Sequence, residues 1–189
     1  MPRATAALPV AVALAALLST GGSVAKPARL GAARPASLCA NDERVVYTCR
    51  FGVKLGSVCL ARNSLHYRFG PHGRPELHIA STPDWSNIHT GGNRSQGGLN
   101  QDYIRFTNGM THYVVHVDET GSLNENPGRQ SSGIEVLQGS SGERTLASLT
   151  CRSPASFDWS AYDDLAKAAP KDWDGADTPG GPFELSTEP

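Results

Sequence analysis

Four cysteines behind an apolar leader constrain this chain more than any other feature. Residues 1–25 combine a basic start, an apolar run from Ala6 to Leu18 and small residues at Ser23 and Ala25, which is the pattern of a cleavable signal peptide. An exported chain folds where thiols oxidise, and an even number of cysteines then predicts disulfides. The cysteines are Cys39, Cys49, Cys59 and Cys151. We therefore expect a periplasmic or secreted protein held by two disulfides.

Nothing in the chain predicts an integral membrane segment once the leader is removed. The apolar run of the leader is shorter than the about 20 residues that a bilayer-spanning helix needs, and no later stretch is as long or as apolar. A lipid anchor on Cys39 is a competing hypothesis. Residues 35–38 lack the leucine followed by small residues that marks a lipoprotein cleavage site, so we favour Cys39 as a disulfide partner.

Charge divides the remaining chain into a mildly basic body and an acidic end. Residues 26–151 carry 13 Lys and Arg against 10 Asp and Glu, and residues 152–189 carry 3 against 8. The basic residues are scattered and form no stripe that could follow a phosphate backbone. We therefore expect no nucleic-acid partner.

The stretch from Glu43 to Cys151 alternates apolar and polar residues in short runs separated by turn residues, which predicts antiparallel sheet. The expected strands are Glu43–Arg50, Leu55–Ala61, Ser64–Phe69, Glu76–Ser81, Gln101–Asn108, Thr111–Asp118, Gly133–Gly139 and Glu143–Cys151. Sequential strands joined by short turns favour a meander, and a meander of this size must close or fold over to protect its edges. The expected fold is an all-β, eight-stranded antiparallel meander, barrel-like, with one short C-terminal helix.

The Asn108-Gly109 pair predicts a two-residue turn, because these residue types accept the positive φ angles that such a turn requires. This turn sets Phe106 opposite Thr111. The buried face of the hairpin then consists of Ile104, Phe106, Tyr113, Val115 and Val117. The opposite, polar strand face carries Tyr103, Arg105, His112, Val114 and His116.

A second hairpin is predicted to turn through residues 70–74. Charge pairing favours Arg68 opposite Glu76, and the same register sets His66 opposite His78. The buried side of this hairpin then consists of Leu65, Tyr67, Phe69, Leu77 and Ile79.

The expected meander also predicts which cysteines pair. Its first and last strands lie side by side when it closes, so Cys49 is expected to join Cys151. Cys39 is then left to pair with Cys59.

The chain divides into four parts. They are a signal peptide at residues 1–25, an extended leader at 26–38, a disulfide-stapled β domain at 39–169 and an acidic tail at 170–189. The domain ends in an amphipathic helix predicted over 158–169, which Pro170 terminates. The tail is rich in Gly and Pro and is expected to be disordered.

The stretch from Thr82 to Asn100 is the best candidate for a binding surface. It is rich in Gly, Asn and Ser, and a connection of this length is uncommon unless it is functional or disordered. It carries Trp85, His89 and Arg94, and Trp and Arg are among the residue types that dominate interface energetics. The competing interpretation is that Trp85 closes one end of the barrel.

No catalytic or metal-binding motif stands out in the sequence. His66 and His78 lie side by side in the predicted register but lack a third ligand, and His112 and His116 are about 13 Å apart along one strand. There is no Gly-x-Ser-x-Gly turn to present a nucleophile. We therefore expect no catalytic residue, no cofactor and no metal site.

Residues 43–49, 54–59 and 67–70 resemble a group of uncharacterised small exported bacterial proteins. The chain is also remotely similar to the membrane-associated inhibitors of c-type lysozyme, eight-stranded barrels in which a Tyr-x-Cys of the first strand pairs with a cysteine that ends the last strand. Tyr47-Thr48-Cys49 and Cys151 stand in the corresponding places. The Ser-Gly-x-x-Tyr and Phe-Trp-x-Lys-Gly segments of the inhibitors have no counterpart here, so the resemblance implies an architecture and transfers no inhibitory residue.

These observations favour a binding module for a protein or cell-envelope ligand, with an inhibitor as one form of it. Two alternatives stay open. One is a small envelope hydrolase that uses a histidine of the polar strand face, and the other is a structural envelope protein without a discrete site. A histidine within about 3.2 Å of both a serine or cysteine and a carboxylate would favour the hydrolase.

Overall fold

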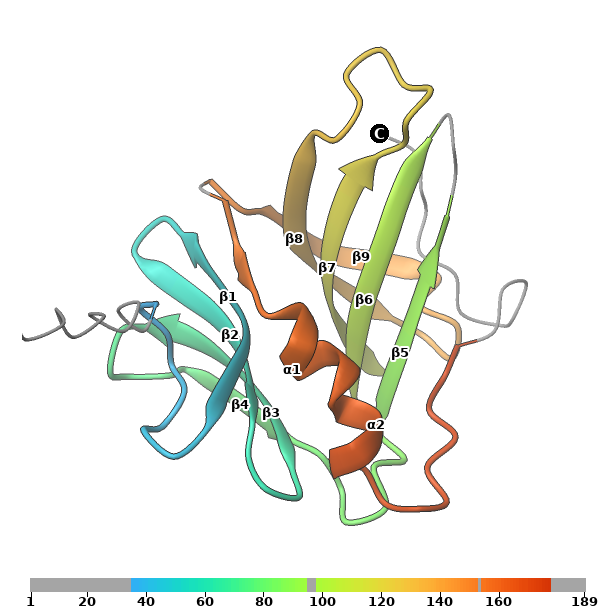
Figure 1. Cartoon of the computed structure of the whole chain (residues 1–189). Helices are drawn as coiled ribbons and strands as arrows, with labels where there is room; N and C mark the ends of the chain where they lie inside the picture. The colour runs from blue at the N-terminus through green and yellow to red at the C-terminus, as the bar shows by residue number, and fades with distance from the viewer. Residues whose placement is uncertain (1–34, 95–97, 153, 178–189) are drawn as a thin grey trace, which may run out of the picture. The chain divides into compact units, whose positions relative to one another are not determined.

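The computed structural model describes residues 35–94, 98–152 and 154–177 (Figure 1). The predicted signal peptide and most of the extended leader lie outside the described residues, as do residues 178–189 of the predicted tail. No helix of the described part is long and apolar enough to cross a membrane.

The described residues form two antiparallel five-stranded sheets. The first sheet has the order β10 (Ser156–Phe157), β1 (Arg44–Phe51), β2 (Lys54–Leu60), β3 (Leu65–Pro71) and β4 (Leu77–Ala80). The second has the order β5 (Ile88–Asn93), β6 (Leu99–Asn108), β7 (Thr111–Thr120), β8 (Gln130–Gln138) and β9 (Arg144–Thr150). All eight predicted strands are present, but the described residues also form β5 and β10, so the predicted eight-stranded meander is wrong. The predicted barrel is wrong as well, since β4 and β5 do not pair and the sheets stay separate.

Both sheets contribute to one hydrophobic core, which explains why two open sheets are stable. Residues of β1 to β4 and of β5 to β8 belong to the same buried cluster. At its centre the Tyr67 ring of β3 lies 5.6 Å from the Phe106 ring of β6 and 5.7 Å from the Tyr113 ring of β7. Sheets that pack face to face bury the apolar side chains of both inner faces in this way.

The two predicted disulfides are confirmed, although the reason given for one of them is not. Cys39 pairs with Cys59, with 5.4 Å between their Cα atoms, and Cys49 pairs with Cys151, with 6.0 Å between theirs. Cys49 lies in β1 and Cys151 directly follows β9, so this bond connects the two sheets rather than closing one barrel.

The β6–β7 hairpin has a different register from the predicted one. Asn108 lies opposite Thr111, and Gly109, with a φ of 60°, takes the first position of the turn. The two central residues of the turn are Gly109 and Met110, and only the first of them needs the positive φ that glycine accepts. Asn108 is therefore the last residue of β6 and not part of the turn. The shift is two residues, and the predicted buried face is therefore preserved, with Ile104 and Phe106 inside.

The β3–β4 hairpin is shifted by two residues in the same way. Arg68 lies opposite His78 rather than opposite Glu76. The reason is that the two charges find other partners: Arg68 binds Glu43, and Lys54 binds Glu76. The predicted buried side is confirmed, because the even shift keeps every side chain on its face.

The predicted helix is split into α1 (Trp159–Asp163) and α2 (Leu165–Ala168). The carboxylate of Asp158 caps α1 by accepting a hydrogen bond of 3.0 Å from the backbone N–H of Ala161. Ala161 and Leu165 are buried in the core, and this places Trp159 at the outer start of α1. Figure 1 shows α1 beside β1, and the short orange strand just before α1 is β10, which pairs with β1.

Two terminal segments are packed onto the sheets. The N-terminal segment, residues 36–43, covers part of the outer face of the first sheet, where Leu38 donates its backbone N–H to Ser57 Oγ. The C-terminal segment, residues 171–177, runs along the edge of β5, and Ala176 forms a parallel bridge with Thr90. The sequence places this second segment in a disordered tail, whereas the structure orders it.

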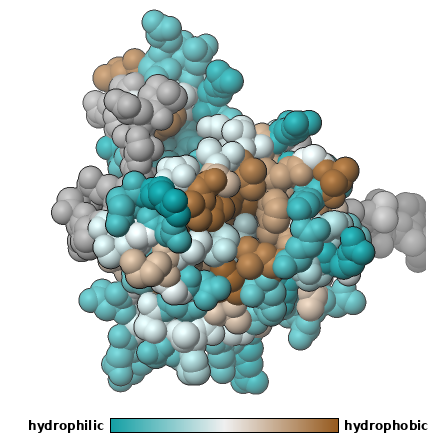
Figure 2. All heavy atoms as spheres, turned by 180° about the vertical axis from the view of Figure 1, so that it is seen from behind, coloured by the Kyte–Doolittle hydropathy of each residue, from teal (hydrophilic) through white to brown (hydrophobic). Residues whose placement is uncertain are grey.

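The core also reaches the surface at its margins. Several half-buried hydrophobic side chains pack against it, including Phe51, Phe69, Leu77, Val136 and Leu149. Figure 2 shows hydrophobic side chains gathered on one face of the protein and framed by hydrophilic ones. Two sheets that do not close leave their inner faces partly open in this way.

Candidate functional site

A cavity of about 300 Å³ lies where the ends of β6, β7 and β8 meet β10 and the start of α1. It is lined by Arg94, Asn100, Asp102, Val117, Asp118, Glu119, Gln130, Ser131, Ser132, Ala155, Phe157 and Trp159. The lining therefore combines residues of both sheets and of the helical segment, which only the folded chain brings together.

One wall of the cavity is aromatic. The rings of Phe157 and Trp159 are 4.4 Å apart and meet edge to face, and Tyr162 packs against both of them. Trp159 is nevertheless 50% exposed, although large aromatic side chains are usually buried. A half-exposed tryptophan supported by two other rings is a rigid apolar surface for a ligand.

The lining also contains charged groups, and two of them form an ion pair. Arg94 donates two hydrogen bonds to the carboxylate of Asp102, at 2.8 and 2.9 Å. Both bonds come from Nη2, and they raise the pKa of the Arg94 guanidinium. The Asp102 side chain is largely buried whereas that of Arg94 is mostly exposed. Arg94 Nη1 also donates to the backbone carbonyls of Asn93 and Gln101, so the guanidinium is held in one orientation.

Asp118 is the most enclosed charged group in the lining. Burial acts to raise the pKa of its carboxyl, but hydrogen bonds from His116, Gln101 and Ser131 more than offset burial and hold that pKa below its ordinary value. The His116 Nδ1 and Gln101 Nε2 atoms both lie 2.8 Å from carboxylate oxygens of Asp118. Asp118 is thus a fixed negative charge at the floor of the cavity.

A second hollow continues from the first. It has a volume of about 710 Å³ and is lined by Arg94, Asn100, Glu119, Thr120, Ser122, Pro127 and Gly128. Arg94, Asn100 and Glu119 border both hollows. We call the two together the Arg94 groove; its length suits an extended ligand better than a small compact one.

The three predicted binding residues lie in three different surroundings. Arg94 borders the groove. Trp85 is fully buried, with its ring 5.5 Å from that of Trp173 and its Nε1 donating to the backbone carbonyl of Asn63. Trp85 is therefore a core residue and not an exposed anchor, which favours the interpretation that it closes the end of the core.

His89 lies on the outer face of the second sheet, opposite Arg105 of β6. It is half-buried, and its Nδ1 is the buried side-chain atom without a hydrogen-bond partner among the described residues. Burial, and then the positive charge of Arg105, lower the pKa of His89. The predicted polar strand face is thus largely enclosed: Arg105 and His112 are buried, and Asp177 of the C-terminal segment binds Arg105.

The sequence does not predict Trp159, Phe157 and Asp102 as groove residues. Trp159 is included in the predicted helix, where its spacing indicates a buried stripe. The sequence does hold a signal that Trp159 is exposed. Asp158 is a good helix N-cap, so Trp159 is the first residue of the helix and lies at its exposed end. Asp102 gives no such signal, since only the fold brings it against Arg94.

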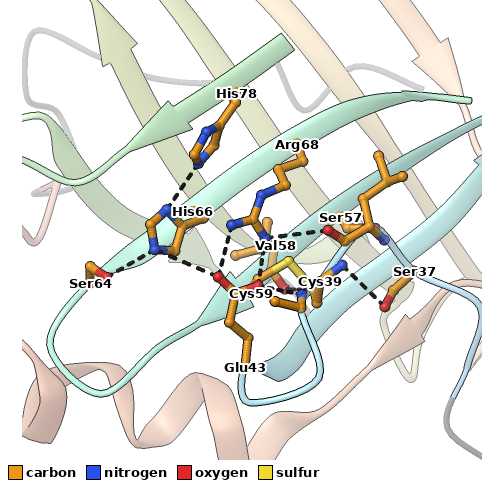
Figure 3. Close-up of polar contacts among 12 residues, drawn as sticks. Ser37, Cys39, Glu43, Ser57, Val58, Cys59, Ser64, His66, Arg68 and His78 are labelled. Carbon is orange, nitrogen blue, oxygen red and sulfur yellow. Dashed lines mark hydrogen bonds and ion pairs between the residues drawn. A yellow bond between two sulfur atoms is a disulfide. The ribbon is translucent and has the colours of Figure 1, made fainter. Parts of the chain in front are cut away.

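A second polar cluster lies on the outer face of the first sheet (Figure 3). Glu43 of the N-terminal segment accepts hydrogen bonds of 2.5 and 2.8 Å from the guanidinium of Arg68. His66 Nε2 lies 2.9 Å from Ser64 Oγ, and His66 Nδ1 lies 3.0 Å from His78 Nε2. The hydrogen bond with Arg68 lowers the pKa of Glu43 despite its burial, so the carboxylate is ionised at neutral pH.

Neither histidine cluster completes the arrangement that nucleophilic hydrolysis requires. His66 contacts Ser64, but the Glu43 carboxylate is 3.7 Å away and on the same ring nitrogen. His116 contacts Asp118 at 2.8 Å, and no serine among the described residues has a hydrogen bond to its other nitrogen. In a catalytic triad the base lies between the nucleophile and the carboxylate.

Comparison with known proteins does not distinguish a binding module from a hydrolase or a structural protein. No family model matches this chain, and neither a curated protein nor a solved structure matches it. Its function has to be inferred from the residues of the groove and of the two polar clusters.

Proposed function

We propose that the protein is an exported binding module, periplasmic or secreted, that holds a segment of a protein or cell-envelope ligand in the Arg94 groove. The observation that carries this proposal is the half-exposed Trp159 beside the paired charges of Arg94 and Asp102. An aromatic anchor next to an oriented guanidinium is the combination that supplies most of the affinity at interfaces.

Export is supported by the leader pattern and by the two disulfides. Disulfides persist in oxidising compartments and are rare in the cytosol, where thiols are kept reduced. The four cysteines are all consumed in the two bonds.

The chemistry of the groove suits binding better than catalysis. The charges of Arg94 and Asp102 neutralise each other, and Asp118 is held ionised by three hydrogen bonds. A general acid or base needs a pKa near the working pH, and a carboxyl with a lowered pKa is a poor one. These groups can instead donate to and accept from a polar ligand while Trp159 packs on its apolar part.

A small envelope hydrolase is the second candidate, and the pairing of His116 with Asp118 favours it. A carboxylate that binds Nδ1 orients a histidine so that Nε2 can act as a base. His116 Nε2 lies over Gly133, where a side chain would collide with it.

Inhibition of a lysozyme-like enzyme remains one form of the binding function proposed first. The Cys49–Cys151 disulfide agrees with the resemblance to the lysozyme inhibitors, whereas the two separate sheets do not.

The proposal is tested by capture from an envelope fraction on immobilised protein. Trp159→Ala is expected to weaken capture by at least about 2 kcal/mol, or about 30-fold, as for an interface anchor. Met110→Ala is the matched control, because Met110 is also exposed but lies at the opposite end of the β6–β7 hairpin. If both variants and the parent protein capture the same ligand equally well, the ligand does not bind in the Arg94 groove. If none of them captures a ligand, a structural role is favoured.

A further inference from the structure

Although the sequence predicts no metal site at His66 and His78, because a third ligand is lacking, we propose that these two side chains and water form an exchangeable site for a divalent transition-metal ion on the outer face of the first sheet. This site is separate from the Arg94 groove and does not depend on the function proposed for it. Both imidazoles come from neighbouring antiparallel strands, β3 and β4, so the fold and not a flexible loop sets their separation.

The distance between the two rings suits shared coordination. His66 Nδ1 and His78 Nε2 are 3.0 Å apart, and the ring centroids are 5.2 Å apart (Figure 3). Imidazole nitrogens bind zinc at about 2.0–2.1 Å, and two such bonds at about a right angle place the nitrogens about 3 Å apart. A small tilt of each ring would therefore aim both lone pairs at one ion without moving the backbone.

The surroundings of His66 select the nitrogen that would bind the ion. Its Nε2 lies 2.9 Å from Ser64 Oγ and 3.7 Å from the carboxylate of Glu43. With the proton of His66 on Nε2, its Nδ1 lone pair accepts the hydrogen bond of 3.0 Å from His78 Nε2, and a bound ion would take the place of that proton while His78 carries its own proton on Nδ1. Metal-binding histidines commonly donate their second ring N–H to an oxygen acceptor, which fixes the tautomer and orients the ring.

The charges around the two imidazoles are also paired. The positive charge of Arg68 itself is balanced by its ion pair with Glu43, which limits its repulsion of a cation.

The ligand set indicates which ions would bind. Imidazole suits zinc, copper and nickel, and copper(II) is expected to bind most tightly in the usual order of divalent affinities. His78 is exposed, so water can take the remaining coordination positions. The nearby group of Cys39, Glu43 and Cys59 is not a competing thiolate site, because the two sulfurs form a disulfide.

The test is a calorimetric titration of the untagged protein with zinc chloride and with copper(II) sulfate at neutral pH. We expect one ion per chain, and His78→Gln should weaken binding at least about tenfold, the usual scale for losing a ligand interaction. His72→Gln is the matched control, since His72 is an exposed histidine in the turn between the same two strands.

Because His78 is exposed, His78→Gln is expected to fold, and an unchanged circular dichroism spectrum checks this. Ring resonances of His66 and His78, and not of His72, should broaden when copper(II) is added. Affinity unchanged by His78→Gln, equal loss in His72→Gln, or no heat of binding with either salt would each overturn the proposal.

Discussion

The N-terminal segment is attached to the first sheet and the C-terminal segment to the second, and the two attachments differ in kind. The N-terminal segment is tied to the first sheet by the Cys39–Cys59 disulfide and by the ion pair of Glu43. The C-terminal segment lies along the second sheet without a disulfide, through the ring of Trp173 and the carboxylate of Asp177. The first attachment persists when its polar contacts break, whereas the second must be maintained by contacts alone.

Because the attachments differ, the two segments contribute to the stability of the protein in different ways. A disulfide acts largely by restricting the unfolded chain, so its effect depends on the length of the loop that it closes. A noncovalent segment stabilises only while it is docked, and it can detach as a local unit before the rest unfolds. The edge of β5 is therefore the part of the described protein that we expect to open first.

Removing the Cys49–Cys151 disulfide should have the largest effect on stability. The bond spans 102 residues, and the chain-entropy model gives about 4–5 kcal/mol for a loop of this size. The Cys49→Ser/Cys151→Ser variant is compared with Cys39→Ser/Cys59→Ser, for which the shorter loop predicts about 3 kcal/mol. Urea denaturation measures both, and a larger loss for the shorter loop would contradict this order.

Truncation after Ala169 should destabilise by about 3 kcal/mol or more, because it removes the C-terminal segment and uncovers Trp85. Loss of a fully buried aromatic side chain costs about 3–5 kcal/mol, and the truncation removes the half-buried Trp173 and also uncovers Trp85. Trp173 packs edge to face on Trp85 and donates its Nε1 to the carbonyl of Ile88. Truncation after Asp177 is the control, since it keeps the docked segment. Equal unfolding midpoints for the two truncations would show that the segment contributes nothing.

Asp177→Asn should cost about 1.5–3 kcal/mol, the range for hydrogen bonds to charged groups. Its carboxylate accepts hydrogen bonds from both the guanidinium of Arg105 and the hydroxyl of Tyr103, and both partners are buried. Asp174→Asn is the matched control, because Asp174 is exposed in the same segment. Thermal unfolding of the two variants measures the difference, which should vanish if the ion pair is only a surface contact.

The pH dependence of stability should be the smallest of these effects. Glu43 has a lowered pKa in the folded protein, so its contribution is present above its ordinary value of 4.5 and is lost as the pH falls below it. His66 and His78 also have lowered pKa values, so the unfolded chain binds more protons and stability falls as the pH drops through 6.5. Glu43→Gln should flatten the acidic part of this profile in urea denaturation, and an unchanged profile would rule out Glu43 as its source.

The sequence predicts the strands and their faces well, because alternation has a period of two residues. The same property explains the errors in register. A shift of two residues keeps Ile104 and Tyr67 buried, so the burial pattern cannot distinguish the right pairing from the wrong one. The strand β5 is missed because Gly91 and Gly92 indicate a loop, and its pairing with β6 depends on contacts that the local sequence does not reveal.

The candidate site is less predictable than the fold. Arg94 can be found from its residue type, but Asp102 and Trp159 reach it only through tertiary packing. Trp85 misleads for a related reason. A tryptophan in a polar stretch looks exposed, but Trp85 belongs to the core of the two sheets, and Trp173, from a segment that the sequence predicts to be disordered, packs on it.

The proposed ligand contacts the Arg94 groove and not the covered sheet faces. The most direct measurement introduces a photo-crosslinking phenylalanine analogue at position 159, and at position 110 as a control, in the cell that exports the protein. We predict one discrete crosslinked product from position 159 and none from position 110. Products of the same mass and yield from both positions, or from position 110 alone, would contradict the account.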